Sequence, residues 1–232
     1  MHVLGIETST KTGSVAVVAE TSLVAEYTLN IEITHSERLM ATVDRVLTDA
    51  GISLSTIDGF AVAIGPGSFT GLRVGLSTIK GLSLATGKPV AAVPTLRALA
   101  GNLPYAAYPV CPLLDARKNE VYAALYRQEE RGLVQVMEEQ AIPLAGLAQA
   151  IGEKTLFTGE ASGLYGDAIR ELLGDRALFA PRAARVPSAA SVAEIGRAMI
   201  KRGNTVDPDS LTPRYVRRPE AEVAWEKRKK SR

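Results

Sequence analysis

The chain has 232 residues, 46% of them hydrophobic, and its 27 lysines and arginines nearly balance 25 acidic residues. This length fits one large domain or two of about 100 residues each, and the charge does not indicate a general nucleic-acid-binding surface. A single cysteine, Cys111, excludes a disulfide framework. The N-terminus lacks a signal-peptide pattern, and Arg73 and Lys80 interrupt the longest apolar run. We therefore expect a cytoplasmic protein with no membrane partner.

The first hundred residues read as strands and helices of one α/β domain. Three early apolar runs are close enough in sequence to pair antiparallel as a meander. Helices then alternate with strands, which predicts a mixed sheet with helices packed on it. The predicted strands cover residues 3–7, 14–19, 23–29, 60–64 and 90–93, and the predicted helices cover residues 37–50 and 68–86.

The stretch at residues 65–87 contains a turn and the most apolar helix of the chain. The sequence GPGS at residues 65–68 cannot continue a strand, and Ser68 is placed to cap the helix that follows. Two pairs of small residues are each four apart, Gly71 with Gly75 and Ser77 with Gly81. Because a helix that is apolar nearly all round is buried on more than one side, we expect a second helix layer, from this chain or another.

The second half again alternates strands with helices, after a change in the sequence pattern near residue 101. We predict an N-terminal domain at 1–103, a smaller domain at 104–206 and a basic, partly mobile extension at 207–232. Predicted strands cover residues 110–115, 121–126, 133–137, 155–158 and 177–179, and predicted helices cover residues 144–151, 164–173 and 188–201.

The hairpin at residues 7–13 has the form of a phosphate-binding turn. A strand ends in an acidic residue, and a turn rich in hydroxyl groups leads into the next strand, so backbone N–H groups and hydroxyls could hold nucleotide phosphates. An ordinary polar hairpin is the alternative. The candidate vestigial nucleotide-binding residues are Glu7, Thr8, Ser9, Thr10 and Thr12.

No other motif supplies a set of catalytic or metal-binding residues. The GPGS turn lacks the Gly-Lys-Ser/Thr of a P-loop. Ser77 and Lys80 match S-x-x-K, but the accompanying K-T-G lies before them and no Ser-Asp-Asn occurs. The two histidines, His2 and His35, lack the spacing of a zinc site. We therefore predict no catalytic residue and no metal.

Four motifs together resemble the TsaB (YeaZ) family of bacterial tRNA threonylcarbamoyladenosine biosynthesis proteins. The LTPRYVRR segment at 211–218 is similar to that family's C-terminal signature. The resemblance implies two actin-like or sugar-kinase-like (ASKHA) domains, each a mixed sheet with packed helices. The motifs are GIETSTKTGSVAV (5–17), THSERL (34–39), GPGSFTGLRVG (65–75) and GKPVAAVPTLRAL (87–99).

The resemblance implies a non-catalytic scaffold. Such a chain is the heterodimer partner of a TsaD-like catalytic subunit, to which a TsaE-like ATPase attaches, and the complex transfers threonylcarbamoyl to the adenosine beside the tRNA anticodon. The chain would meet tRNA only through the complex, form a homodimer when alone and have no cofactor except ATP or ADP at the partner interface. The alternatives are an active ATPase or phosphotransferase that uses the 7–13 hairpin, and a protease acting on TsaD.

The resemblance also places the partner interface on the N-terminal helices near residues 37–50 and 68–86. Each apolar position there has an alternative as ordinary core, because one sequence cannot separate two buried faces. The predicted partner-facing residues are Met40, Val43, Leu47, Leu72, Leu76 and Ile79, beside Gly71 and Gly75.

Overall fold

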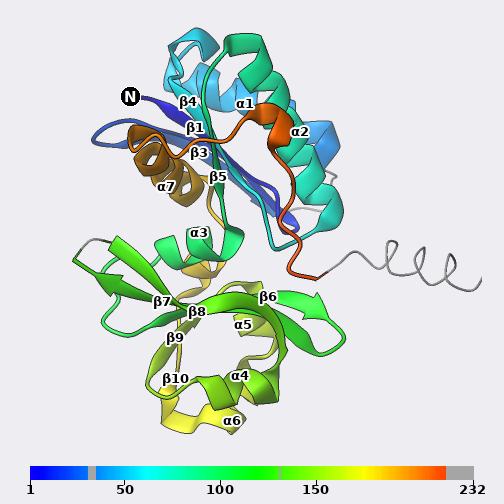
Figure 1. Ribbon diagram of the computed structural model, residues 1–232, viewed down its shortest axis with the longest axis vertical. Helices are drawn as coiled ribbons and strands as arrows, with labels where there is room; N and C mark the ends of the chain where they lie inside the picture. The colour runs from blue at the N-terminus through cyan, green and yellow to red at the C-terminus, as the bar shows by residue number, and fades with distance from the viewer. Residues whose placement is uncertain (31–34, 131, 218–232) are drawn as a thin grey trace, which may run out of the picture.

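The computed structural model describes residues 1–30, 35–130 and 132–217 (Figure 1). Thr34, the first residue of the THSERL motif, and most of the basic extension, residues 218–232, lie outside the described residues. Within them, two five-stranded sheets form the centres of the two halves of the molecule.

The first sheet has the strand order β3-β2-β1-β4-β5. The first three strands pair antiparallel as the predicted meander, and β4 and β5 continue the sheet in parallel. All five strands predicted for this half are confirmed, with ends that shift by up to two residues. They are β1 (Val3–Glu7), β2 (Thr12–Val18), β3 (Leu23–Asn30), β4 (Gly59–Ala63) and β5 (Val90–Val93).

Helices α1 (His35–Ala50) and α2 (Phe69–Thr86) cover one face of this sheet. As predicted, Ser68 caps α2 and accepts a hydrogen bond from the Gly71 N–H, at 3.3 Å. The helix ends at Gly87, whose positive φ of 68° suits glycine. The largest core cluster lies between this face of the sheet and the inner sides of the two helices.

Helix α7 (Ala189–Lys201) covers the opposite face of the first sheet, although it follows the second sheet in the chain (Figure 1). Two glycines permit this close packing. A Cβ on Gly5 would lie 2.5 Å from the Ala189 carbonyl oxygen, and one on Gly196 would lie 2.3 Å from the Ala61 Cβ. The predicted range of 104–206 groups α7 with the second sheet, so it does not anticipate this return.

The second sheet repeats the order of the first, as β8-β7-β6-β9-β10. Three antiparallel strands again come first, and two parallel strands follow. The strands predicted for this half are all present, and β8 is longer than expected. They are β6 (Val110–Arg117), β7 (Glu120–Glu129), β8 (Gly132–Pro143), β9 (Thr155–Thr158) and β10 (Ala177–Phe179).

Three short helices cover the outer face of the second sheet: α4 (Leu144–Ala150), α5 (Glu160–Leu164) and α6 (Gly166–Leu173). The single helix predicted at 164–173 is wrong at its start, because Tyr165 leaves helical geometry and separates α5 from α6. The poor helix propensity of Gly163 and Gly166 around it favours this break.

Helix α3 (Thr95–Gly101), which the sequence did not predict, lies between the two sheets and packs on the second (Figure 1). Each half therefore contributes its last helix to the other half's sheet. Short 3-10 turns complete the chain at η1 (Leu54–Thr56), η2 (Gly174–Arg176), η3 (Arg182–Arg185) and η4 (Pro208–Ser210). Among the described residues, none of the helices has the length and apolar character of a membrane span.

Candidate partner-binding surface

The inner face of α2 belongs to the core of this chain. Leu72, Leu76 and Ile79 are at most 3% exposed and lie in the cluster between α2 and the first sheet, together with Val43 of α1. A side chain without exposed area cannot contact a partner while the domain stays folded. The prediction that these four residues face a partner is therefore corrected, and their alternative as ordinary core applies.

The two glycines predicted to admit a second helix admit the first hairpin instead. A Cβ on Gly75 would lie 2.4 Å from the Thr8 hydroxyl oxygen. That hydroxyl donates a 2.8 Å hydrogen bond to the Gly71 carbonyl oxygen. Gly71 and Gly75 thus bring α2 against the end of β1, and both are buried.

Helix α1 leaves one predicted residue on the surface. Met40 is 54% exposed. Leu47 is half-buried and packs against the first core cluster. Of the predicted interface set, Met40 is the side chain best placed for a partner.

The opposite side of α2 presents a second surface, which includes the predicted small-residue pair Ser77 and Gly81 but none of the predicted partner-facing residues. We call Ser77, Gly81, Leu84 and Ala85 the α2 outer face; all four are exposed, and Leu84 is 67% exposed. A Cβ built on Gly81 meets no described atom within 4 Å, and Gly81 has no positive φ. A glycine inside a helix costs up to about 1 kcal/mol relative to alanine. Packing within the described chain therefore does not account for Gly81, whereas it does account for Gly75.

The predicted nucleotide-binding hairpin is buried and bonded to itself. Glu7, Thr8, Ser9, Thr10 and Thr12 are all buried. The Glu7 carboxylate accepts the Ser9 N–H at 2.5 Å, and the Thr10 hydroxyl accepts the Thr12 N–H at 3.1 Å. These N–H groups would have to face a phosphate to bind it. In this structure the hairpin instead supports the turn before α2, where the Ser68 N–H donates to the Ser9 carbonyl oxygen at 2.6 Å.

The electrostatics of Glu7 also oppose phosphate binding. Burial raises the pKa of its carboxyl to about 7, and the hydrogen bonds from Ser9 lower it by less. Its second oxygen has no hydrogen-bond partner among the described residues. When ionised, this carboxylate would repel a phosphate group, and when protonated it would be a poor ligand for a divalent cation.

The described residues contain no group of three or more histidine, cysteine, aspartate or glutamate side chains placed to hold a metal ion. Cys111 is fully buried in the core of the second sheet. Burial raises the pKa of its thiol above the usual value, which disfavours the reactive thiolate. Cys111 is therefore a core residue.

Comparisons with known proteins agree with this architecture. The family model described as "TsaD: tRNA N6-adenosine threonylcarbamoyltransferase" matches residues 23–225. A Bacillus subtilis protein named tRNA threonylcarbamoyladenosine biosynthesis protein TsaB is 32% identical over 228 residues, covering 97% of this chain and 98% of the relative. The Escherichia coli protein of the same name is 31% identical over 235 residues, covering 98% of each.

Solved structures show the same fold. The structure titled "YeaZ from Pseudomonas aeruginosa" matches with a TM-score of 0.77 and 28% identity over 92% of this chain and 99% of that one. A Thermus thermophilus ROK hexokinase matches with a TM-score of 0.51 and 13% identity over 88% of this chain and 100% of that one, a likeness of fold alone. The two-domain ASKHA fold is thereby confirmed, and the chain belongs to the TsaB (YeaZ) family.

Proposed function

We propose that this chain is a non-catalytic scaffold subunit in the transfer of threonylcarbamoyl to tRNA adenosine. Its full-length relatives carry names from threonylcarbamoyladenosine biosynthesis, and the matching family model is named for the transferase. The chain's own hairpin is buried and bonded to itself. A role through a surface fits these observations better than a role through an active site.

The proposal rests mainly on the exposure of the α2 outer face. Gly81 has no packing role among the described residues. Leu84 on the same helix and Met40 on α1 both expose apolar surface that water does not favour. Small residues beside exposed apolar ones let a second helix approach closely. We propose that a helix of a TsaD-like catalytic subunit packs here, between α1 and the outer side of α2.

For the remaining parts of the complex we propose what the resemblance to the family implies. A TsaE-like ATPase attaches to the heterodimer. Any bound nucleotide lies at the interface between the two subunits. The chain meets tRNA only through the complex. Without its partner, the chain covers the same surface by forming a homodimer. The ATPase alternative requires the hairpin at residues 7–13 to open, because the Ser9 and Thr12 N–H groups are bonded within the chain.

A matched pair of glycine variants tests the docking surface. In both Gly81→Arg and Gly152→Arg, the new Cβ enters space free of described atoms, on α2 and in the second domain respectively. Size-exclusion chromatography with the TsaD-like subunit should show co-elution of the wild-type chain and G152R, but not of G81R. Co-elution of G81R at wild-type affinity would remove the α2 outer face from the interface.

A further inference from the structure

The last described residues form a segment that crosses from the first domain to the second. We call residues 211–217 the C-terminal strap. Leu211 is buried in the first core cluster, and the Arg214 N–H donates a 2.7 Å hydrogen bond to the Ile64 carbonyl oxygen. A Cβ on Gly65 would lie 2.5 Å from the Arg214 carbonyl oxygen, so the strap lies directly on the turn before α2.

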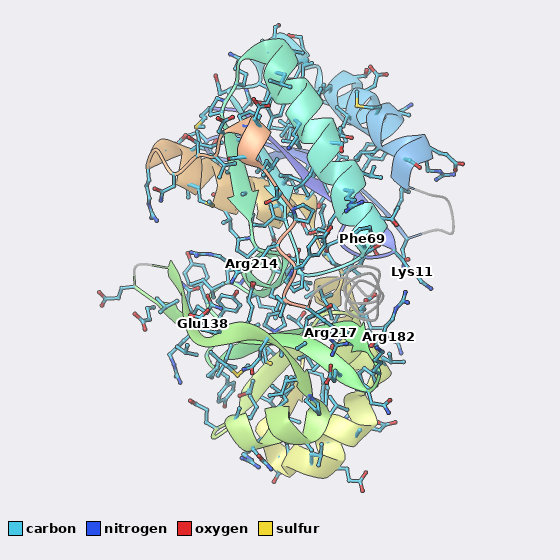
Figure 2. The ribbon with its side chains drawn as sticks, turned by 45° about the vertical axis from the view of Figure 1, so that its right-hand side comes forward. Lys11, Phe69, Glu138, Arg182, Arg214 and Arg217 are labelled. Carbon is cyan, nitrogen blue, oxygen red and sulfur yellow. The ribbon has the colours of Figure 1, made fainter. Side chains whose placement is uncertain are left out.

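Aromatic stacking holds the strap on the first turn of α2. The rings of Tyr215 and Phe69 stack with centroids 5.5 Å apart and planes 22° apart. The Arg73 guanidinium lies 3.8 Å from the centroid of the Phe69 ring. Figure 2 shows Phe69 at the end of α2 that faces the second domain, with Arg214 and Arg217 on the strap beside it.

Two arginines of the strap reach the second domain. The Arg214 guanidinium lies 3.3 Å from a Glu139 carboxylate oxygen on β8. Arg217 pairs with Glu120 of β7 and donates a 3.1 Å hydrogen bond to the Ala116 carbonyl oxygen. The Glu139 side chain is only 1% exposed. Without Arg214, the buried Glu139 carboxylate would have no ion pair among the described residues, which is costly, and movement of β8 toward water would relieve that cost.

The chain crosses between the domains in two other segments, and hydrogen bonds join these two segments to each other. The Asn102 side-chain amide donates to the carbonyl oxygens of Val186 at 2.8 Å and Ala184 at 3.3 Å, and its oxygen accepts the Ser191 hydroxyl at 2.6 Å. Asn102 thus joins the outgoing crossing at residues 102–109 to the returning one at 180–188. A pair of crossings joined at one place can act as a hinge, and a third connection elsewhere would stop its motion.

We propose that the C-terminal strap is a latch that fixes the relative orientation of the two domains. Its aromatic and backbone contacts fasten it to the first domain, and its two arginine–glutamate pairs fasten it to the second. Without the two arginine–glutamate pairs the joined crossings are free to bend, so the domains sample a wider range of orientations. The latch acts within the chain and needs no partner.

Distance measurements between spin labels in the two domains test the latch. Labels at Thr48→Cys on α1 and Gln149→Cys on α4 occupy exposed positions, whereas the native Cys111 is buried. The full-length chain carries the labels and is diluted with unlabelled chain, so that distances within a homodimer do not contribute. The latch predicts one narrow distance distribution for this chain.

The decisive comparison uses Arg214→Ala/Arg217→Ala and the control Arg127→Ala, which removes an ion pair with Glu153 inside the second domain. The strap variant should gain a second population of distances, and the control should keep the single one. A wild-type distribution in a folded strap variant overturns the proposal. If that variant does not fold, Arg217→Gln, which leaves the Arg214–Glu139 pair in place, is measured with the same two outcomes.

Charge reversal tests whether the ion pair between Arg214 and Glu139, rather than packing of the strap, fixes the orientation of the domains. Arg214→Glu alone should broaden the distance distribution, because two carboxylates then face each other across the strap. Adding Glu139→Arg should restore the narrow distribution. Failure of the second substitution to restore it, with both variants folded, contradicts the assignment of Glu139 as an anchor of the latch.

Discussion

At the residue scale, Glu7 is the most unusual group of the first domain. Its carboxyl is fully buried at the end of β1, and its pKa is raised from 4.5 to about 7. The folded chain therefore holds a proton that the unfolded chain releases at lower pH. By linkage, the stability that the protonated carboxyl contributes is fully present below about pH 4.5 and is lost as the pH rises through about 7.

This linkage predicts a pH-dependent loss of stability that depends on Glu7. Moving the pKa from 4.5 to about 7 corresponds to about 3 kcal/mol of unfolding free energy, lost between pH 4.5 and 8. Glu7→Gln keeps an oxygen to accept the Ser9 N–H and removes the titration. Urea denaturation at several pH values should show this component in the wild type and not in E7Q. An identical pH dependence of both proteins would contradict the assignment.

Ile79 tests whether the inner side of α2 is core. It is fully buried, so Ile79→Ala should lower the unfolding free energy of the isolated chain by about 3 kcal/mol. The exposed Leu84→Ala is the matched variant on the same helix and should change stability by less than about 0.5 kcal/mol. Denaturant unfolding measures both values. Normal stability of I79A together with a lost complex would return Ile79 to the interface.

At the element scale, a substitution of Gly81 should have opposite effects on the stability of helix α2 and on the binding of a partner. Gly81→Ala adds a methyl group in open space and improves helix propensity, so it should stabilise the isolated chain by up to about 1 kcal/mol. The same methyl group should weaken binding of the TsaD-like subunit, because it holds the two helices apart. Thermal unfolding and titration calorimetry measure the two effects. Unchanged or tighter binding would show that no close helix contact occurs at Gly81.

The elements also show what sequence patterns can predict. Short apolar runs located every strand of the described residues, and the Ser68 cap marked the start of α2. Helix α3 was missed because seven residues are too few for a periodic pattern to stand out, and most of them are buried. For α2, apolar residues nearly all round predict a buried helix but not which side the sheet covers, so the sequence alone does not separate its core residues from an interface.

At the scale of the whole molecule, the repeated order of the two sheets agrees with the prediction of two related α/β units. The exchange of α3 and α7 between the halves could not be predicted, because it depends on contacts between residues far apart in sequence. The C-terminal signature at residues 211–218 pointed to the family but not to its structural role. The position of the C-terminal strap between the domains supports its proposed role in fixing their relative orientation.

The central claim is that this chain supports threonylcarbamoyl transfer by docking and performs no transfer itself. The most direct test is a reconstituted assay with tRNA, threonylcarbamoyl-adenylate, the TsaD-like subunit and the TsaE-like ATPase, to which wild-type chain, G81R or G152R is added. We predict modified tRNA with the wild type and G152R, a large loss with G81R, and none when this chain is the only protein present. Transfer by this chain alone, or full activity with G81R, would contradict the account.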